Sequence, residues 1–203
     1  SEKTFNDVYA MVTSTRYKNY PLYASHTRFR ARLEEPERDL LKEFLTTDDQ
    51  IEKLKAVGGM AGVRTGPTPT KTDPDSRVAN DCLGSSKSYA QFISHAKTKG
   101  LKIAFGSDIN GVTQQIGPRL GVERCYAATP VGGLRSREAL PPGVKRFDTD
   151  GLKHIGYLPD LYEDLVGLRT NGVEALNDGA ESFISMWEKA YETPIRKTVN
   201  SAN

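Results

Sequence analysis

Three short, mostly apolar segments that alternate with helical patterns most constrain what this chain can fold into. The segments cover 22–25, 60–63 and 102–105, and their length is typical of buried strands. Apolar residues at helical spacing predict helices over 3–16, 37–45, 48–57, 86–99, 159–169 and 173–191. Strands that alternate with helices are typical of parallel βαβ units. The sequence therefore predicts an α/β fold built on a parallel sheet.

Turn and capping residues support several of these boundaries. Thr47 precedes the helix at 48–57 and is followed by Gln50, which is the pattern of a capping box. Gly58 follows the same helix, and a left-handed glycine commonly ends a helix. Between 109 and 150 the chain is rich in glycine and proline, so we expect turns and loops there.

The last predicted helix carries an apolar stripe. Its members are Leu176, Phe183, Ile184, Trp187 and Tyr191. Apolar residues at this spacing lie on one face of a helix. We expect the stripe to pack in the core rather than to bind a ligand.

The number of strands bears on which α/β fold this is. A parallel sheet of three strands has two open edges, and a complete (β/α)8 barrel needs about 250 residues, whereas the chain has 203. The helix at 3–16 also has no strand before it in this chain. We favour the C-terminal part of a (β/α)8 TIM barrel over residues 1–192, with a polar tail at 193–203. The N-terminal half would then be a separate chain or a cleaved fragment; a small open α/β sheet, complete in itself, is the alternative.

The charge balance argues against a nucleic-acid partner. The chain has 28 Lys and Arg against 26 Asp and Glu, a net charge of +2, and its basic residues are scattered. No apolar run is long enough to cross a bilayer, so we expect no membrane-spanning segment. A homo-oligomer is left open.

The cysteines leave two alternatives. Cys82 and Cys125 are the only two, and both fall in predicted loops. One disulfide between loops and two free thiols are equally compatible with this number. A disulfide would favour a secreted or periplasmic location, because disulfides persist in oxidising compartments.

A histidine and an aspartate follow the first and third predicted strands. His26 ends the strand at 22–25, and Asp108 follows the strand at 102–105. The carboxyl ends of parallel strands meet at one face, where βα folds place their chemistry. Imidazole and carboxylate are ligands of zinc, so the pair indicates a metal-assisted hydrolase. A structural histidine is the alternative for His26 alone.

Three motifs carry a resemblance to a known family. Residues Ser25-His-Thr-Arg-Phe-Arg30 resemble Ser-His-Ser-Asn-Ala-Arg of the membrane dipeptidases, zinc peptidases of the amidohydrolase superfamily. Residues Gly106-Ser-Asp-Ile-Asn-Gly-Val112 resemble the Gly-Ser-Asp-Phe-Asp-Gly-Val of that family, and 151–165 resembles the helix after its last strand. The resemblance implies a (β/α)8 barrel with two zinc ions, and hydrolysis of a small peptide-like substrate.

The resemblance also implies roles for individual residues. His26 and Asp108 match zinc ligands, and Asp108 is also expected to be catalytic, taking a proton from the attacking water and returning it. Arg30 matches a family arginine, and Arg38 lies one position from the arginine that grips the substrate carboxylate. Asn110 replaces a family aspartate and is expected to contribute to substrate binding. The remaining ligands of the family have no match here and are expected on the N-terminal half.

Several of these residues have a second interpretation. His154 is expected either to bind substrate or to cap a helix, as is common before a helix. The arginines after His26, namely Arg28, Arg30 and Arg38, are expected either to bind the substrate carboxylate or to form ion pairs with neighbouring glutamates. His95 is expected at the surface or in packing, without a metal role.

The sequence thus predicts a zinc-dependent, dipeptidase-like amide hydrolase. Hydrolysis of an ester, lactone or N-acyl bond is an alternative, motivated by Asn110 and by the displacement of Arg38. A barrel without metal that serves as a binding or structural module is another.

Overall fold

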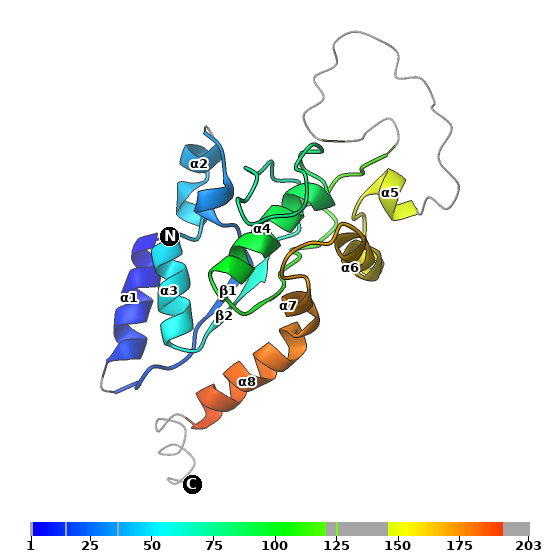
Figure 1. The fold of residues 1–203 in the computed structure, drawn as a ribbon. Coiled ribbons are helices and arrows are strands. Elements are labelled where there is room, and N and C mark those ends of the chain that lie inside the picture. Colours follow the sequence, from blue (N-terminus) through cyan, green and yellow to red (C-terminus); the bar gives the residue numbers. More distant parts are fainter. Residues whose placement is uncertain (1, 15, 36, 121–124, 126–145, 193–203) are drawn as a thin grey trace.

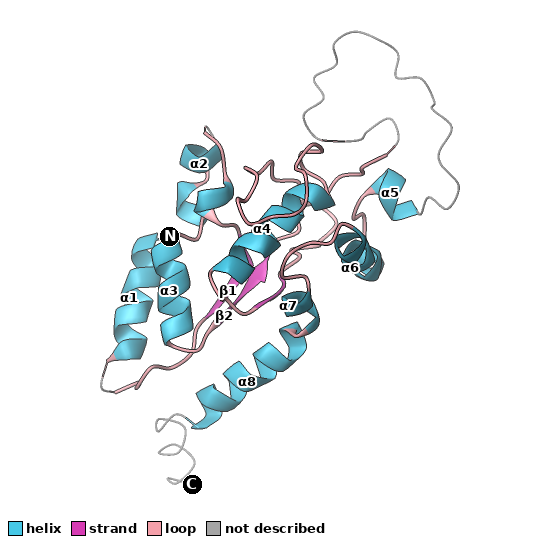
Figure 2. Cartoon of the chain, in the orientation of Figure 1, coloured by secondary structure: helices cyan, strands magenta, loops and turns pink. Residues whose placement is uncertain are grey.

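The computed structural model describes residues 2–14, 16–35, 37–120, 125 and 146–192. Its strands and α-helices are β1 (Tyr23–Thr27), β2 (Met60–Val63), β3 (Ile103–Phe105), α1 (Glu2–Thr13), α2 (Glu37–Leu40), α3 (Asp48–Ala56), α4 (Ser86–Thr98), α5 (Arg146–Asp150), α6 (Leu158–Gly167), α7 (Glu174–Asn177) and α8 (Gly179–Glu192). Short 3-10 helices are η1 (Arg30–Arg32), η2 (Lys42–Phe44) and η3 (Ile155–Tyr157). The polar tail at 193–203 lies outside the described residues. Figure 1 shows α1 beside α3, and Figure 2 shows how small the sheet is relative to the helices around it.

The strands form one parallel sheet in the order β1-β2-β3. Ala61 pairs with Ala24 on β1 and with Ile103 on β3, so β2 is the central strand. This confirms the predicted α/β class and its parallel sheet. The described residues form three strands with β1 and β3 at the edges, and no closed barrel is seen among them.

One face of the sheet packs against α4 and forms the main core. The ring of Tyr89 on α4 stacks on Phe105 with centroids 6.3 Å apart, and its hydroxyl donates to the Val63 carbonyl oxygen. Phe29 contacts Phe92 of α4 edge to face. Burial raises the pKa of Tyr89, so this phenol stays protonated. Phe29, Tyr89 and Phe92 are at most 2% exposed, so they belong to the core.

The other face of the sheet carries small residues and is covered by α8. Gly179, at the start of α8, lies so close to Ala104 that a Cβ there would be 3.1 Å from the Ala104 side chain. Phe183 of α8 contacts the ring of Tyr23. Side chains alternate between the faces of a strand, so Ala104 and Phe105 point to opposite faces. Helices therefore cover both faces of the sheet.

The expectation that the apolar stripe of the last helix packs in the core is wrong for most of its members. Leu176 is buried, but it lies on α7, because the predicted helix over 173–191 is interrupted at Asp178. Phe183, Ile184 and Tyr191 are about half exposed, and Trp187 is 54% exposed. A sheet of three strands is too narrow for α8 to bury its whole apolar face.

Several local predictions are confirmed, and others need correction. Thr47 forms the predicted capping box with Gln50, and Gly58 ends α3 with φ +69°. The segment 109–150 is not all loop, because α5 occupies its last five residues. Most of the remainder of that segment lies outside the described residues.

Candidate active site

His26 lies within β1, at an irregularity in the pairing of this strand with β2. The sequence had instead placed it at the end of the strand. Ala24 pairs with Ala61 and Thr27 with Val63, so β1 has one more residue than β2 between these pairs. His26 has φ 54°, in the left-handed region that non-glycine residues rarely adopt. Such an extra residue is a β-bulge, which bends a strand and re-aims a side chain. The His26 side chain is 51% exposed.

Asp108 follows β3 and also has a left-handed backbone, with φ 55°. Its Oδ1 lies 3.8 Å from His26 Nε2, although β2 separates the two strands that carry these residues. Neighbouring strands are about 4.8 Å apart, so the strand ends are roughly 10 Å from each other. The side chains therefore converge across β2, as the positions of the two residues in the sequence led us to expect.

Arg64 completes the group from the central strand. It follows β2, and its Nε donates to Asp108 Oδ2 over 3.1 Å. The Arg64 side chain is only 14% exposed, so this pair is better shielded from water than most surface ion pairs. We did not identify Arg64 from the sequence. The available signal was its position, since it follows β2 as Asp108 follows β3.

A hydrogen-bonded support lies beneath Asp108. Thr65 is fully buried, and its hydroxyl donates to Gln115 Oε1 over 2.6 Å. Gln115 Nε2 in turn donates to the backbone carbonyl oxygen of Asp108 over 3.2 Å. These bonds connect the loops after β2 and β3. They help to hold the Asp108 backbone in a conformation that costs about 1 to 2 kcal/mol in a non-glycine residue.

The other predicted substrate residues are not gathered at this group. Arg38 Nη2 forms an ion pair with Glu35, which is the alternative interpretation of these arginines. Asn110 Oδ1 accepts from the backbone N–H groups of Val112 and Thr113, so it shapes its own loop. Arg30 is partly exposed on η1.

His154 acts as a helix cap. Its Nδ1 accepts from the Gly156 N–H over 3.1 Å at the start of η3. Its ring lies 4.1 Å from the ring of Tyr157, centroid to centroid. The capping interpretation therefore describes what His154 does in this structure.

His95 is buried, so the expectation of a surface position is wrong and that of packing is confirmed. Its Nε2 lies 3.0 Å from Asp48 Oδ1, and its Nδ1 lies 3.5 Å from Asp73 Oδ2. Asp73 Oδ2 also forms an ion pair with Arg32 Nη1 over 3.0 Å. Every polar atom of the imidazole thus faces a carboxylate, which explains how a polar ring is tolerated in the interior.

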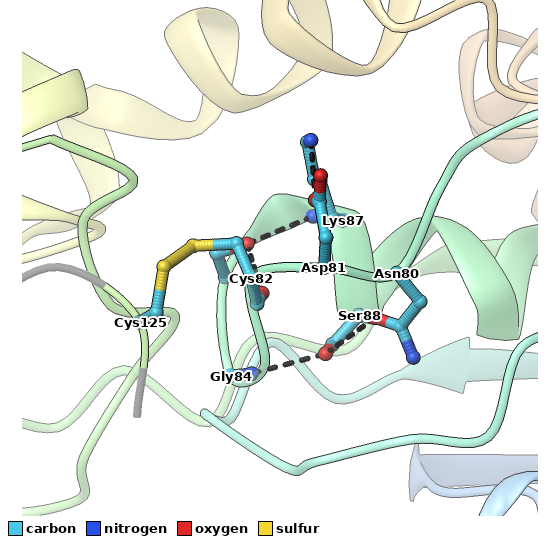
Figure 3. The surroundings of a disulfide bond; sticks show 8 residues. Asn80, Asp81, Cys82, Gly84, Lys87, Ser88 and Cys125 are labelled. Carbon is cyan, nitrogen blue, oxygen red and sulfur yellow. Dashed lines mark hydrogen bonds and ion pairs between the residues drawn. A yellow bond between two sulfur atoms is a disulfide. The ribbon is translucent and has the colours of Figure 1, made fainter. Parts of the chain in front are cut away.

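The cysteines form a disulfide. Cys82 and Cys125 are bridged, with Cα atoms 4.8 Å apart and a sequence separation of 43 (Figure 3). The Ser85 hydroxyl donates to the Cys82 carbonyl oxygen over 2.6 Å and also caps α4 by accepting from the Lys87 N–H. The bond therefore ties the residue at 125 to the start of α4.

Comparison of the chain with protein-family models, with curated proteins and with solved structures gives no match. The geometry of the site therefore carries the functional argument.

Within the described ranges no helix has the length and hydropathy that a membrane span needs.

The donor set at the strand ends fits part of a zinc site. His26 Nε2 and Asp108 Oδ1 are both zinc donors, and two ligands of a tetrahedral zinc ion lie about 3.3 Å apart. Closing their 3.8 Å separation to that value needs only a small side-chain rotation. A zinc site needs three or four ligands, and no group of three or more His, Cys, Asp or Glu side chains suited to a metal is found in the part of the chain that the structure describes.

Proposed function

We propose that the carboxyl ends of β1 and β3 form part of the active site of a zinc-dependent hydrolase that cleaves a small peptide-like amide substrate. The observation that carries the proposal is the convergence of His26 Nε2 and Asp108 Oδ1 to 3.8 Å from two strands that are not neighbours. Both residues have left-handed backbones, and such conformations cluster at functional sites, where the surrounding fold sustains their cost.

Each residue has a distinct task in this proposal. His26 and Asp108 hold the metal, which when bound acidifies water and polarises a carbonyl group. Asp108 takes a proton from the attacking water and delivers it to the leaving amine, so the carboxylate ends the cycle unprotonated. Arg64 holds Asp108 Oδ2 and so directs Oδ1 toward His26. Esters, lactones and N-acyl compounds need the same proton transfers and are alternative substrates.

We further propose that the remaining ligands come from outside the described residues, on the N-terminal half of a (β/α)8 barrel. Among the described residues β1 and β3 are edge strands of a three-stranded sheet, and this supports the proposal, because parallel sheets normally have more strands. The half-exposed aromatic side chains of α8 support it too, since large exposed apolar patches commonly mark contact sites. The mixture of this chain with a matching barrel half, or a longer chain that contains both, should therefore bind two zinc ions.

The disulfide leads us to propose a secreted or periplasmic location. Disulfides of this kind are rare in reducing compartments. Alkylation of the unreduced protein under denaturing conditions should modify neither Cys82 nor Cys125. Modification of both would contradict the proposal.

A metal-free binding module is the second candidate, and the Arg64–Asp108 ion pair favours it. This pair balances the charge of Asp108 without a metal ion. In a metal-free module, the His26–Asp108 contact would be a simple polar contact at an exposed edge. Titration with a metal ion separates the two candidates.

The test is a titration with Co²⁺ of the metal-free mixture of this chain and a matching barrel half, or of a longer chain that contains both. Co²⁺ substitutes for Zn²⁺ and reports its ligands through visible absorption. The wild type should give a saturable absorption band, because an imidazole and a carboxylate converge at the strand ends. The variants His26→Ala and Asp108→Asn should each weaken binding by about tenfold or more. His154→Ala is the matched control, since His154 is a helix cap, and it should bind as the wild type does.

Binding that His26→Ala leaves unchanged would contradict the zinc proposal. Binding lost equally in His154→Ala would do the same, because it would place the metal elsewhere. If neither the wild type nor any variant binds Co²⁺ saturably, the metal-free module is favoured.

A further inference from the structure

Two arginine side chains meet beside Gly66, next to the His26–Asp108 pair. A Cβ atom on Gly66 would lie 3.0 Å from Arg64 Nη1 and 3.6 Å from Arg28 Nη2. The guanidinium groups thus border the same small space, which stays open because residue 66 has no side chain. Arg28 comes from the loop after β1 and Arg64 from the end of β2, so two neighbouring strands supply the pair.

The residues that the structure describes do not balance the charges of this group. Arg64 is paired with Asp108 through Nε. Arg28 has no ion pair with any carboxylate that the structure describes, and its buried Nε has no hydrogen-bond partner there. Arg28 and Arg64 against Asp108 give the group one net positive charge.

Close guanidinium groups repel each other unless an anion lies between them. Two neighbouring arginines have charged partners: Arg32 pairs with Asp73 and Arg38 with Glu35. The buried Nε of Arg28 has no hydrogen-bond partner among the described residues, as is also true of Arg32 and Arg38, but Arg28 differs from them in having no ion pair with a described carboxylate. A buried N–H without an acceptor is costly, and a ligand oxygen would remove that cost.

We propose that Arg28 and Arg64 form a subsite over Gly66 for a carboxylate group of the ligand. A planar carboxylate accepts hydrogen bonds from two guanidinium groups at once, which is the geometry that arginine forks favour. A monoanion also matches the single net positive charge of the group. A phosphate dianion would leave an excess negative charge beside Asp108, so the group should bind phosphate less well.

This inference builds on the proposed function only in treating the carboxylate as part of the substrate. If both hold, the enzyme prefers substrates with a carboxylate near the scissile bond. The carboxylate would then be held by Arg28 and Arg64, whereas the sequence offered Arg28, Arg30 and Arg38 for this role and did not indicate Arg64. Arg38 is already paired with Glu35.

The experiment is an NMR titration of the ¹⁵N-labelled, metal-free protein with N-acetylglycine, which has one carboxylate. N-acetylglycinamide, the uncharged analogue, and inorganic phosphate are titrated in parallel. The side-chain Nε–H signals of Arg28 and Arg64 report binding directly. Both signals should shift saturably with N-acetylglycine, shift less with phosphate, and stay unchanged with the amide.

Variants assign the effect to the subsite. Arg28→Gln should raise the dissociation constant for N-acetylglycine by about tenfold. Gly66→Ala keeps both charges and should also weaken binding, because its methyl group occupies the space between the guanidinium groups. Arg77→Gln is the control, since Arg77 is exposed and has no side-chain ion pair with a described residue, and it should bind as the wild type does.

Two results would overturn the proposal: N-acetylglycine and its amide shifting the two signals equally, or Arg28→Gln binding as tightly as the wild type. Tighter binding of phosphate than of N-acetylglycine would overturn the choice of a carboxylate. Because no metal is present, these results do not depend on the Co²⁺ titration. A protein that binds Co²⁺ through His26 but not N-acetylglycine keeps the proposed function and loses this subsite.

Discussion

His95 and His26 lie in regions of the molecule that differ in how they surround a histidine side chain. The imidazole of His95 is 5% exposed and lies between the carboxylates of Asp48 and Asp73. His26 is half exposed, has a left-handed backbone, and lies 3.8 Å from Asp108 without a hydrogen bond. His95 provides a partner for both carboxylates, whereas His26 has a strained backbone and leaves its nitrogen accessible. The contrast indicates that His95 contributes to stability, and it supports the proposal that His26 binds a metal.

The largest expected difference between the two is in stability. Replacing His95 by Ala leaves Asp73, itself buried, with one partner fewer, and should lower the free energy of unfolding by about 3 kcal/mol. His26→Ala should change it by less than about 0.5 kcal/mol. Urea denaturation followed by circular dichroism measures both. Equal losses in the two variants would remove the basis of the comparison.

A second substitution isolates the cost of the His26 backbone. Glycine adopts φ 54° without strain, whereas alanine does not, so His26→Gly should be more stable than His26→Ala by about 1 kcal/mol. His154, whose φ is −152°, is the control position, and glycine should bring no gain over alanine there. Urea denaturation of the four variants gives the answer. A His26→Gly variant no more stable than His26→Ala would show that the bulge stores no strain.

The smallest expected effect is on the free energy of unfolding at acid pH, and it arises from a carboxylate next to His95. Burial alone would raise the pKa of Asp48, but hydrogen bonds from Lys99 and His95 outweigh it and hold this pKa below its usual range. A carboxyl group with a depressed folded pKa contributes stability above its unfolded pKa. That contribution is lost as the pH falls below about 4. The effect is small, because 43% of the Asp48 side chain is exposed to solvent that screens the interaction.

The measurement is the free energy of unfolding of Asp48→Asn between pH 2.5 and 6. The variant should lose less stability on acidification than the wild type does. Asp49→Asn is the matched control, because Asp49 pairs with Lys53 at the surface and lies away from His95. An identical pH dependence for wild type and Asp48→Asn would contradict the role given to this carboxylate.

The elements of the fold were largely predictable from the sequence, because local patterns encode them. β2 matches its predicted bounds, and the capping box of Thr47 and Gln50 is present as expected. The β1 bulge was not predictable, since an extra residue in one strand shows only in the pairing with its neighbour. The exposure of Trp187 was not predictable either, because periodicity identifies an apolar face but not whether the fold covers it.

The site was predictable only in part. The sequence placed His26 and Asp108 at the same edge, since the ends of parallel strands meet there. It did not indicate that Arg64 pairs with Asp108, because 44 residues separate the two in the chain. It also left two roles open for His154 and expected Asn110 to bind substrate, whereas the structure shows that both form local hydrogen bonds within their own loops.

One measurement tests the central claim most directly, namely that His26 and Asp108 hold a metal at the strand ends. The protein is crystallised with zinc, and anomalous diffraction is recorded on both sides of the zinc absorption edge. We predict an anomalous peak within bonding distance, about 2.0 to 2.2 Å, of His26 Nε2 and an Asp108 carboxylate oxygen. A well-ordered His26–Asp108 pair without a peak, while zinc is found at another histidine, would contradict the account.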